Sequence, residues 1–413
     1  MKIGINGYEA VIPRFGVNPK TGLPNRVGSS EYCFNLLINL SKIDRKNEYF
    51  IYLPVSPTKD LPVESDSWHY KVLKKRFLWT IFDLSREFIF KKNKLDIFFS
   101  PTHYLPAFLP FKSAISIMDL SFFHFPELFK KKDLYQMKFW TKLSIRKAKR
   151  IFTISNASKS DIIKIYRVPE SKVIVTYPGI KFKSQNSRPK ADQPLAEKLK
   201  MQNSKVLKGK YGIKEDYILF VGTLQPRKNV GRLVEAFSKV ILERSDRISE
   251  KKDPIGRSAP SRMTGELNLI IVGKKGWMYQ EILEAPKKFG VEDRVKFLDF
   301  VPDEDLPALY KNALCFVLPS LYEGFGLPVL EAMQNGCPVI TSNVSSLPEA
   351  GGDAALYVNP EDVDDIADKI QKVISIEKLR HDMIEKGYKQ VKKFSWEKTA
   401  KETLEALEEI VKK

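Results

Sequence analysis

The sequence predicts an α/β protein built from two doubly wound parallel sheets. Short apolar runs rich in Val, Ile and Phe recur along the chain, and stretches with helical spacing separate them. The runs lack clean alternation of apolar and polar residues, which is typical of parallel strands buried on both faces. Because the runs form two series and 413 residues suffice for two domains, we expect two sheets made of right-handed βαβ units.

The expected strands follow from the apolar runs. In the first series they are 2–6, 49–54, 96–100, 114–118, 150–155 and 172–178. In the second series they are 217–222, 267–273, 295–300, 314–319, 338–342 and 355–359. Ligands of such sheets bind at the carboxyl ends of the strands, so the residues after each run are the first candidates for a site.

Polar stretches set the expected domain boundaries. Residues 183–210 separate the two series and are predicted to be a linker or an insertion, which leaves 1–182 and 211–393 as the two domains. Residues 243–266 contain few apolar residues and are broken by Gly and Pro, so we expect a surface loop there. Residues 394–413 follow the second domain.

The net charge of +19 is unevenly distributed. Residues 1–216 contain 40 basic and 19 acidic residues, whereas the rest of the chain contains 29 basic and 31 acidic residues. Two segments of the first half, 74–94 and 129–150, combine basic with aromatic residues. This asymmetry indicates an anionic partner. Basic amphipathic helices at a membrane surface and solvated helix faces explain it equally well, whereas no nucleic-acid-binding motif is present.

Several classes of protein are disfavoured by the sequence. No apolar run approaches the roughly 18–20 residues that a membrane span needs, and the N-terminus lacks the features of a secretory signal. The chain is therefore expected to be cytoplasmic, and peripheral on the inner face of the membrane if its basic helices bind lipid. Cys33, Cys315 and Cys337 lack metal or redox spacing and are predicted to be buried free thiols. The first strand lacks the G-x-G-x-x-G of a dinucleotide oxidoreductase.

A glycine turn follows the strand expected at 314–319. Gly324 and Gly326 allow the backbone to approach a ligand closely, and a helix is predicted to begin near Leu327. The N–H groups and the positive dipole end of such a helix bind anions. Glu323 and Glu331 flank this site and can accept hydrogen bonds from sugar hydroxyls. Taken alone, the turn is a simple strand-to-helix connection and Glu331 an ordinary helix residue.

A basic loop follows the strand that ends at Gly222. It carries Arg227 and Lys228, and Asn229 can cap the helix that comes next. Two adjacent cations at the carboxyl end of a strand can hold a diphosphate, because Arg offers a planar fork of donors and Lys a point charge. Taken alone, the pair is a solvated loop charge.

Together these segments resemble the retaining glycosyltransferases of family 4, also called the group 1 glycosyltransferases. The resemblance rests on E-G-F-G-L-P-x-L-E-A, on the upstream G-T-L-Q-P-R-K-N, and on LPEAGGDAALYVNPED at residues 347–362. It covers nearly the whole chain. It implies the GT-B fold, in which two Rossmann-like domains face each other across a cleft and the C-terminal domain binds most of the donor. It also implies that residues 394–413 form a final helix that crosses back to the N-terminal domain.

The resemblance implies roles for these positions. Arg227 and Lys228 would neutralise the donor diphosphate, in a loop that begins at Gly222. Glu331 would accept hydrogen bonds from the ribose, and Glu323 would lie beside the donor sugar. Residues 300–302 would lie near the nucleobase. Backbone N–H groups that would hold sugar hydroxyls and phosphate oxygens belong to Gly324, Phe325, Gly326 and Leu327.

The first half contains a second glycine loop, NRVGSSEYCFNLLINL, at residues 25–40. It resembles the family loop that reaches the donor phosphates when the cleft closes, and Gly28 and Ser29 are the predicted contacts. A second family glycine is replaced by Ser30. A plain loop that Ser29 or Ser30 caps is an equally good explanation.

Residues 115–129, ISIMDLSFFHFPELF, resemble a family segment with the sequence H-D-L-S-F-x-x-F-P-E. Asp119 matches, but Met118 replaces the histidine that lies near the transferred sugar, and a thioether cannot donate a hydrogen bond. His103 ends an adjacent expected strand and is predicted to take that place. His124 is expected to pack or to face solvent. A structural role is the alternative for both histidines, and we predict that His103 affects turnover more than His124.

The resemblance also implies retention of anomeric configuration and a nucleotide-diphosphate sugar as donor substrate, with no cofactor. The D-x-D strings at 303–305 and 362–364 lie where helices should begin, so acidic first turns explain them and no essential metal is expected. GDP-mannose is the first choice of donor, because D-L-S-F-x-x-F-P-E resembles mannosyltransferases of polysaccharide assembly. A UDP-hexose donor and a GT-B sugar-nucleotide epimerase stay open. The expected acceptor is a glycan or a lipid-linked saccharide.

Overall fold

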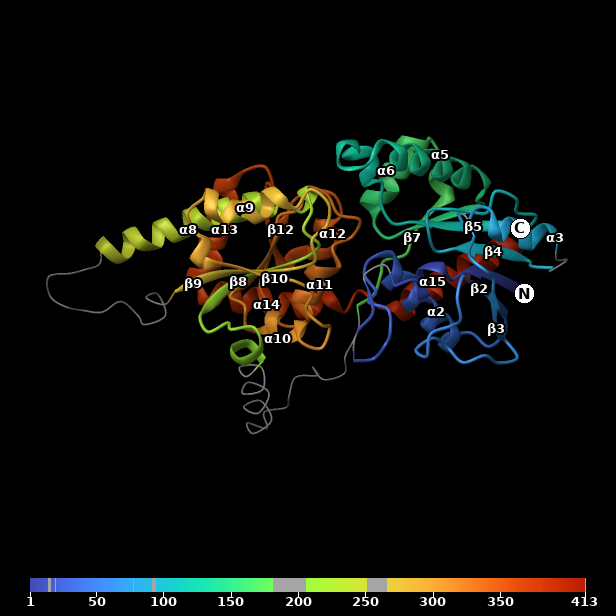
Figure 1. Cartoon of the computed structure of the whole chain (residues 1–413), viewed down its shortest axis with the longest axis horizontal. Coiled ribbons are helices and arrows are strands. Elements are labelled where there is room, and N and C mark those ends of the chain that lie inside the picture. Colours follow the sequence, from blue (N-terminus) through green and yellow to red (C-terminus); the bar gives the residue numbers. More distant parts are fainter. Residues whose placement is uncertain are drawn as a thin grey trace. The chain divides into compact units, whose positions relative to one another are not determined.

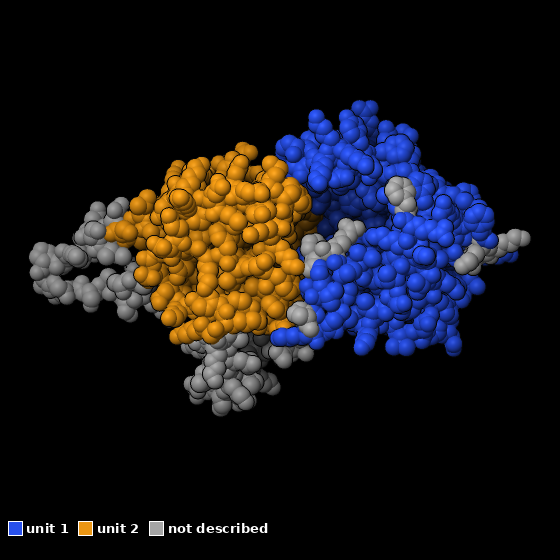
Figure 2. Space-filling model, viewed as in Figure 1, with its two compact units in different colours: residues 1–179, 394–413 blue, residues 180–393 orange. Residues whose placement is uncertain are grey.

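In the computed structural model the chain forms two compact units (Figure 2). Unit 1 comprises Met1–Gly179 and Phe394–Lys413, and unit 2 comprises Ile180–Lys393. The structure describes residues 1–13, 16–18, 20–76, 78–90, 94–180, 206–250 and 266–412.

Unit 1 is built on a parallel sheet of seven described strands in the order β3-β2-β1-β4-β5-β6-β7. The strands are β1 (Lys2–Asn6), β2 (Glu48–Leu53), β3 (Trp68–Val72), β4 (Ile97–Ser100), β5 (Lys112–Ile117), β6 (Arg150–Thr153) and β7 (Val173–Val175). The helices are α1 (Tyr8–Val11), α2 (Ser29–Ile43), α3 (Asp83–Phe90), α4 (Ser121–His124), α5 (Lys131–Lys147), α6 (Asn156–Tyr166) and α15 (Trp396–Lys412). The winding of the chain reverses between β1 and β4.

Helices cover both faces of this sheet, with α5 and α6 on one face and α2 and α15 on the other (Figure 1). Successive residues of a strand point to opposite faces. Ile97 and Phe99 of β4 therefore join the core beneath α2 and α15, whereas Phe98 joins the core beneath α5 and α6. Because both faces are buried, the strand is apolar without alternation, which is the pattern that predicts a doubly wound sheet.

Helix α15 packs in unit 1, although it follows unit 2 in the sequence. Trp396 and Leu407 lie in the same core cluster as Ile3 and Ile5 of β1. At the start of the helix, a Cβ on Gly179 would lie 2.1 Å from the backbone nitrogen of Trp396, so the two segments touch backbone to backbone.

Unit 2 repeats this design with six described parallel strands in the order β10-β9-β8-β11-β12-β13. The strands are β8 (Asp216–Val221), β9 (Leu267–Val272), β10 (Val295–Leu298), β11 (Cys315–Leu318), β12 (Val339–Ser342) and β13 (Ala355–Val358). The helices are α8 (Val230–Glu250), α9 (Gln280–Lys288), α10 (Leu306–Asn312), α11 (Leu327–Gln334), α12 (Leu347–Gly351), α13 (Val363–Ser375) and α14 (Glu377–Val391). Helices α8, α9 and α13 lie on one face of this sheet (Figure 1). Here the winding reverses between β8 and β11.

The structure confirms the predicted fold class, and every expected strand begins within two residues of its predicted start. Strand β3 was not predicted. It has the sequence WHYKV and pairs only with β2 among the described strands. A strand at the edge of a sheet is only partly covered, so its residues need not be apolar. Cys33, Cys315 and Cys337 are buried free thiols, as predicted.

The loop predicted at 243–266 is wrong over its first part, because α8 continues to Glu250. The apolar face of this helix is anchored by residues up to Val240, and a polar sequence can extend an existing helix into water without a costly new nucleus. Residues 251–265 of that prediction, and 183–205 of the predicted linker, lie outside the described residues. Residues Val206–Lys210 form one turn of π-helix.

Candidate functional site

Three strand ends meet where the winding of unit 2 reverses. The loop after β8 turns through a short 3₁₀ segment, Pro226–Lys228, into Asn229, which has a positive φ of 61°. The side-chain amide of Asn229 donates to the carbonyl of Pro319, after β11, at 2.9 Å, and to the carbonyl of Pro360, after β13, at 2.6 Å. The residue predicted as a helix cap thus ties the ends of three strands together.

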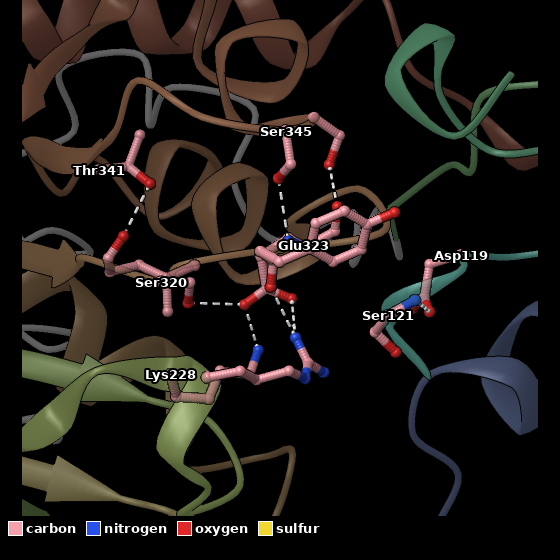
Figure 3. A network of polar contacts seen from close by, with 11 residues as sticks. Asp119, Ser121, Lys228, Ser320, Glu323, Thr341 and Ser345 are labelled. Atoms are coloured by element: carbon pink, nitrogen blue, oxygen red, sulfur yellow. Dashed lines mark hydrogen bonds and ion pairs between the residues drawn. The ribbon is translucent and has the colours of Figure 1, made fainter. Parts of the chain in front are cut away.

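Glu323, in the turn after β11, lies at the centre of this region (Figure 3). Its carboxylate forms an ion pair with Lys228 and a second one with Arg227, whose Nη1 lies 3.1 Å from Oε2. The Ser320 hydroxyl donates to the same carboxylate at 2.7 Å. The structure therefore brings together the two cations and the first glutamate of the sequence prediction.

The backbone around Glu323 is also held by hydrogen bonds. Its N–H donates to the Ser345 hydroxyl at 2.9 Å, and its carbonyl accepts from the Ser346 hydroxyl at 2.8 Å. Arg227 also donates to the carbonyl of Tyr322 at 2.8 Å. The turn is thus held in place by residues that follow β8 and β12 on either side of it.

Burial strengthens the electrostatics of this cluster. Glu323 is 6% exposed and Lys228 7%. Burial alone would raise the pKa of Glu323, but the charges of Lys228 and Arg227, with hydrogen bonds from Lys228 and Ser320, outweigh it and lower the pKa to about 2. The carboxylate therefore stays ionised at neutral pH and is a weak base. The cluster thus contains two cations, Lys228 and Arg227, and one anion, Glu323.

The glycine turn leads into α11, which begins at Leu327 as predicted. Gly326 has a φ of 98°, and a Cβ there would lie 2.8 Å from the Leu347 side chain, so only glycine fits without strain. The first N–H groups of this helix come shortly after Glu323 in the sequence. Together with the positive end of the helix dipole, they provide partial positive charge for an anion.

The second predicted glutamate, Glu331, lies on α11 and is held by a neighbouring helix. The hydroxyl of Tyr310, on α10, donates to Glu331 Oε2 at 3.1 Å. Tyr310 is buried, and burial followed by the negative charge of Glu331 raises its pKa well above the usual value. Tyr310 therefore remains a donor that orients this carboxylate. Phe300, at the position assigned to the nucleobase region, has Lys274 Nζ 4.9 Å from its ring centroid.

Sequence reasoning missed the residues that position Glu323 and Glu331. A usable signal existed for three of them, because the carboxyl ends of neighbouring parallel strands meet at one edge. Ser345 and Ser346 come shortly after β12, and Ser320 comes directly after the strand expected at 314–319. Tyr310 carried no such signal.

Comparison with known proteins identifies the family. Residues 204–390 match the model of the family described as glycosyl transferases group 1. The O-antigen chain mannosyltransferase B of Escherichia coli is 33% identical over 310 residues, which cover 75% of this chain and 73% of that protein. The chain belongs to the group 1 glycosyltransferases. The O-antigen chain mannosyltransferase RfbU of Salmonella typhimurium is 29% identical over 60% of this glycosyltransferase and 57% of that protein.

Solved structures confirm the GT-B fold of this glycosyltransferase. Anabaena Alr3699/HepE, crystallised with UDP and glucose, has a TM-score of 0.68 at 17% identity, and the match covers 99% of this chain and 100% of that one. WaaG, a glycosyltransferase involved in lipopolysaccharide biosynthesis, has a TM-score of 0.65 at 15% identity, with 97% and 98% covered.

In unit 1 of the glycosyltransferase, the predicted glycine loop leads into α2. Gly28 has a φ of 60° and precedes the first residue of the helix, Ser29. The Ser29 hydroxyl donates to Glu9 at 3.4 Å, and the Ser30 hydroxyl donates to the carbonyl of Val27 at 2.9 Å. Ser30 thus closes the loop on itself, and Gly28 supplies the backbone conformation that an L residue rarely adopts.

The structure brings His103 next to the position where the family histidine is replaced. His103 Nε2 accepts the N–H of Met118 at 3.3 Å. Burial lowers the pKa of His103, and the nearby charge of Asp119 opposes this in part. Asp119 accepts the N–H of Ser121 at 3.0 Å and so fixes the start of α4 (Figure 3). His124 is the last residue of α4. It is exposed, and its Nε2 lies 2.9 Å from Asp161.

The two acidic strings lie at helix starts. Asp362 caps α13 by accepting the N–H groups of Asp364 and Asp365 at 3.0 and 3.1 Å. Asp305 precedes α10 and accepts from the hydroxyl of Tyr211 at 2.6 Å and from Lys210. Within the described ranges, no group of three or more His, Cys, Asp or Glu side chains is arranged to hold a metal ion.

Proposed function

We propose that this glycosyltransferase transfers mannose from GDP-mannose to a glycan or lipid-linked saccharide during polysaccharide assembly, with retention of anomeric configuration. The observation that carries the proposal is the buried cluster of Lys228, Arg227 and Glu323 at the switch point of unit 2. The choice of mannose is supported by two O-antigen mannosyltransferases among its relatives.

The cluster suits a departing diphosphate. In the transfer, the bond between the anomeric carbon and the diphosphate oxygen breaks, a bond to the acceptor hydroxyl oxygen forms, and the hydroxyl proton passes to the departing phosphate. Negative charge grows on the diphosphate as it leaves, so cations that are already in place stabilise the transition state more than the ground state. Glu323 holds Lys228 and Arg227 in place before the donor binds.

The remaining donor contacts would come from the glycine turn, from α11, from the loop after β8 and from unit 1. The N–H groups of the turn, from Gly324 to Leu327, would receive sugar hydroxyls and phosphate oxygens. Glu331 would accept from the ribose, and Tyr310 keeps its carboxylate oriented. Gly222 would let the donor approach the loop backbone. In unit 1, the proposed contributors are Gly28, Ser29, His103 and Asp119.

Retention by attack on the same face as the leaving group is supported by the state of Glu323. A carboxylate with a pKa of about 2 that is bonded to two cations is a poor base and a poor nucleophile. A reaction without a metal is supported by Lys228 and Arg227, which supply the charge that a divalent cation would otherwise supply, and by the engagement of Asp305 and Asp362 at helix starts.

Donor and stereochemistry can be tested together. The purified protein is titrated with GDP, UDP, ADP and their sugars while its melting temperature is followed. GDP at about 100 times its Kd is expected to stabilise the fold by about 2.7 kcal/mol. The anomeric configuration of the product is then read by NMR. Stabilisation by UDP and not GDP would replace the donor, and an inverted product would remove the proposed mechanism. A mannose epimer released without any acceptor would indicate an epimerase.

A further inference from the structure

Unit 1 carries an exposed face that mixes aromatic and basic side chains and takes no part in the proposed chemistry. On α5, Tyr135 is 75% exposed and Phe139 is 56% exposed. They are four residues apart and therefore lie on the same side of the helix. Lys132 and Lys142 are also exposed and extend this side at either end. Two aromatic rings thus lie between cations on one helix face.

This face continues from α5 onto α3. The ring of Trp140 lies 5.0 Å from that of Phe139 and 5.8 Å from that of Phe82, centroid to centroid. Phe82, just before α3, is 37% exposed. Arg86 and Ile89 follow on the same side of α3, and Ile89 is 54% exposed. Trp140 therefore connects the exposed rings of two separate elements.

The loop before β5 adds a third element. Phe108 is 47% exposed, and its N–H donates to the Ser85 hydroxyl at 2.9 Å. The N–H of Ala107 donates to the carbonyl of Ile81 at 3.0 Å. These bonds fix the loop against α3. We call the resulting surface the aromatic face; its apolar members are Phe82, Ile89, Phe108, Tyr135 and Phe139.

In the sequence, the two segments that supply most of the aromatic face are strongly basic. Residues 129–150 contain nine basic residues and one acidic residue, and residues 74–94 contain seven basic and two acidic. In the described part of the chain, no helix is long and apolar enough to pass through a bilayer. Exposed rings flanked by cations suit the headgroup layer of an anionic membrane, where the rings meet the acyl boundary and Lys and Arg meet lipid phosphates.

We propose that unit 1 docks on the surface of an anionic lipid bilayer through the aromatic face. This surface belongs to unit 1, whereas the donor cluster belongs to unit 2. Docking therefore does not depend on which nucleotide sugar the enzyme uses, and it can fail or succeed independently of the proposed transfer.

Co-sedimentation with vesicles tests the proposal. Wild type is expected to bind vesicles of phosphatidylcholine with phosphatidylglycerol, and not phosphatidylcholine alone, and binding weakens as salt is raised. Lys132→Gln with Lys142→Gln should lower the affinity about fivefold for each cation removed. Tyr135→Ser with Phe139→Ser should lower it at unchanged charge. Lys311→Gln with Lys389→Gln, exposed lysines of unit 2, is the charge-matched control and should bind like wild type.

The fluorescence of Trp140 can report contact with the bilayer. Trp68, Trp79 and Trp396 are buried, so in a Trp277→Phe background Trp140 is the tryptophan that lipid can reach. Its fluorescence is expected to be quenched by brominated phospholipids in the anionic vesicles. Absence of vesicle binding at low salt would overturn the proposal. So would binding that the serine pair leaves unchanged, or an equal affinity for an oligonucleotide of matched charge, since either marks a general attraction to polyanions.

Discussion

The two sheets of this glycosyltransferase have corresponding strand orders, yet the residues at their switch points differ in charge. In unit 2, Lys228 and Arg227 pair with Glu323 between β8 and β11. In unit 1, the Asn6 side chain at the end of β1 donates to the Ser100 hydroxyl at the end of β4, at 3.0 Å.

The unit 1 cluster is neutral and the unit 2 cluster is ionic. Thr102, whose hydroxyl lies 3.0 Å from that of Ser100, extends the neutral cluster. Fixed charges at the unit 2 switch point suit a diphosphate, whereas Asn6 and Ser100 of unit 1 are fully buried and bond to each other. The same topology thus brings strand ends together in both units, and the residues at those ends decide whether the cluster is charged.

The largest effect is expected from Lys228→Met. In the proposed reaction Lys228 would face the charge that develops on the diphosphate, so kcat/KM with the preferred donor should fall by about 10²–10³, equivalent to about 3–4 kcal/mol of barrier. Lys311→Met, the same change at an exposed lysine of unit 2, is the matched control. Equal rates for the two variants would show that the reaction does not depend on the charge of Lys228.

Glu323→Gln should reveal how much stability the ionic cluster contributes. The folded pKa of about 2 lies below the ordinary value of 4.5. This carboxylate therefore stabilises the fold above pH 4.5, and the contribution, up to about 3 kcal/mol, is lost as the pH falls toward 2. The free energy of unfolding should differ between wild type and variant at pH 7, and the difference should shrink in acid.

The control for this pH dependence is Glu361→Gln, at an exposed glutamate of the same unit. Its difference from wild type should be small at every pH. A Glu323→Gln difference that stays constant from neutral to acidic pH would falsify the assigned pKa.

His103→Ala tests the contribution of unit 1 to turnover. Burial lowers the pKa of His103, so the ring is neutral at pH 7 and can exchange hydrogen bonds with hydroxyl groups. Turnover should fall about tenfold, equivalent to about 1.4 kcal/mol, whereas His124→Ala, at an exposed ring paired with Asp161, should stay close to wild type. If His124→Ala has the larger effect on kcat, the assignment fails.

The smallest effect is expected from Tyr310→Phe. The change removes one hydrogen bond to Glu331, at a cost of about 1 kcal/mol, and leaves the carboxylate in place. The KM for the donor should rise a few-fold while kcat stays nearly constant. A fall in kcat at unchanged KM would mean that Glu331 acts on the reacting sugar and not on the nucleotide.

The sequence was sufficient where a single stretch of chain decides the structure. The pair Arg227–Lys228, the turn at Gly326 and the start of α11 follow from local patterns and were predicted. β3 was not, because an edge strand such as WHYKV lacks the apolar signature of a buried one. The extension of α8 was also missed, since residues 243–250 are polar and continue a helix that other residues anchor.

The residues that position the site were harder to predict than the site residues themselves. The bond from the N–H of Glu323 to Ser345 joins residues 22 positions apart, and the bond from Tyr310 to Glu331 joins two helices. Such contacts depend on how the elements pack and not on local sequence. His103 was predicted from the Met118 replacement, yet the hydrogen bond that joins the two residues required the three-dimensional structure.

The packing of α15 in unit 1 has a consequence for synthesis on the ribosome. Residues 1–179 leave the exit tunnel first, but Trp396 and Leu407, which share a core with Ile3 and Ile5, are made only after unit 2. At about 5–20 residues per second, the nascent chain waits on the order of ten seconds or more with this apolar surface uncovered. Unit 2 can therefore complete its fold before unit 1, and the early segment is the one that chaperones have most time to bind.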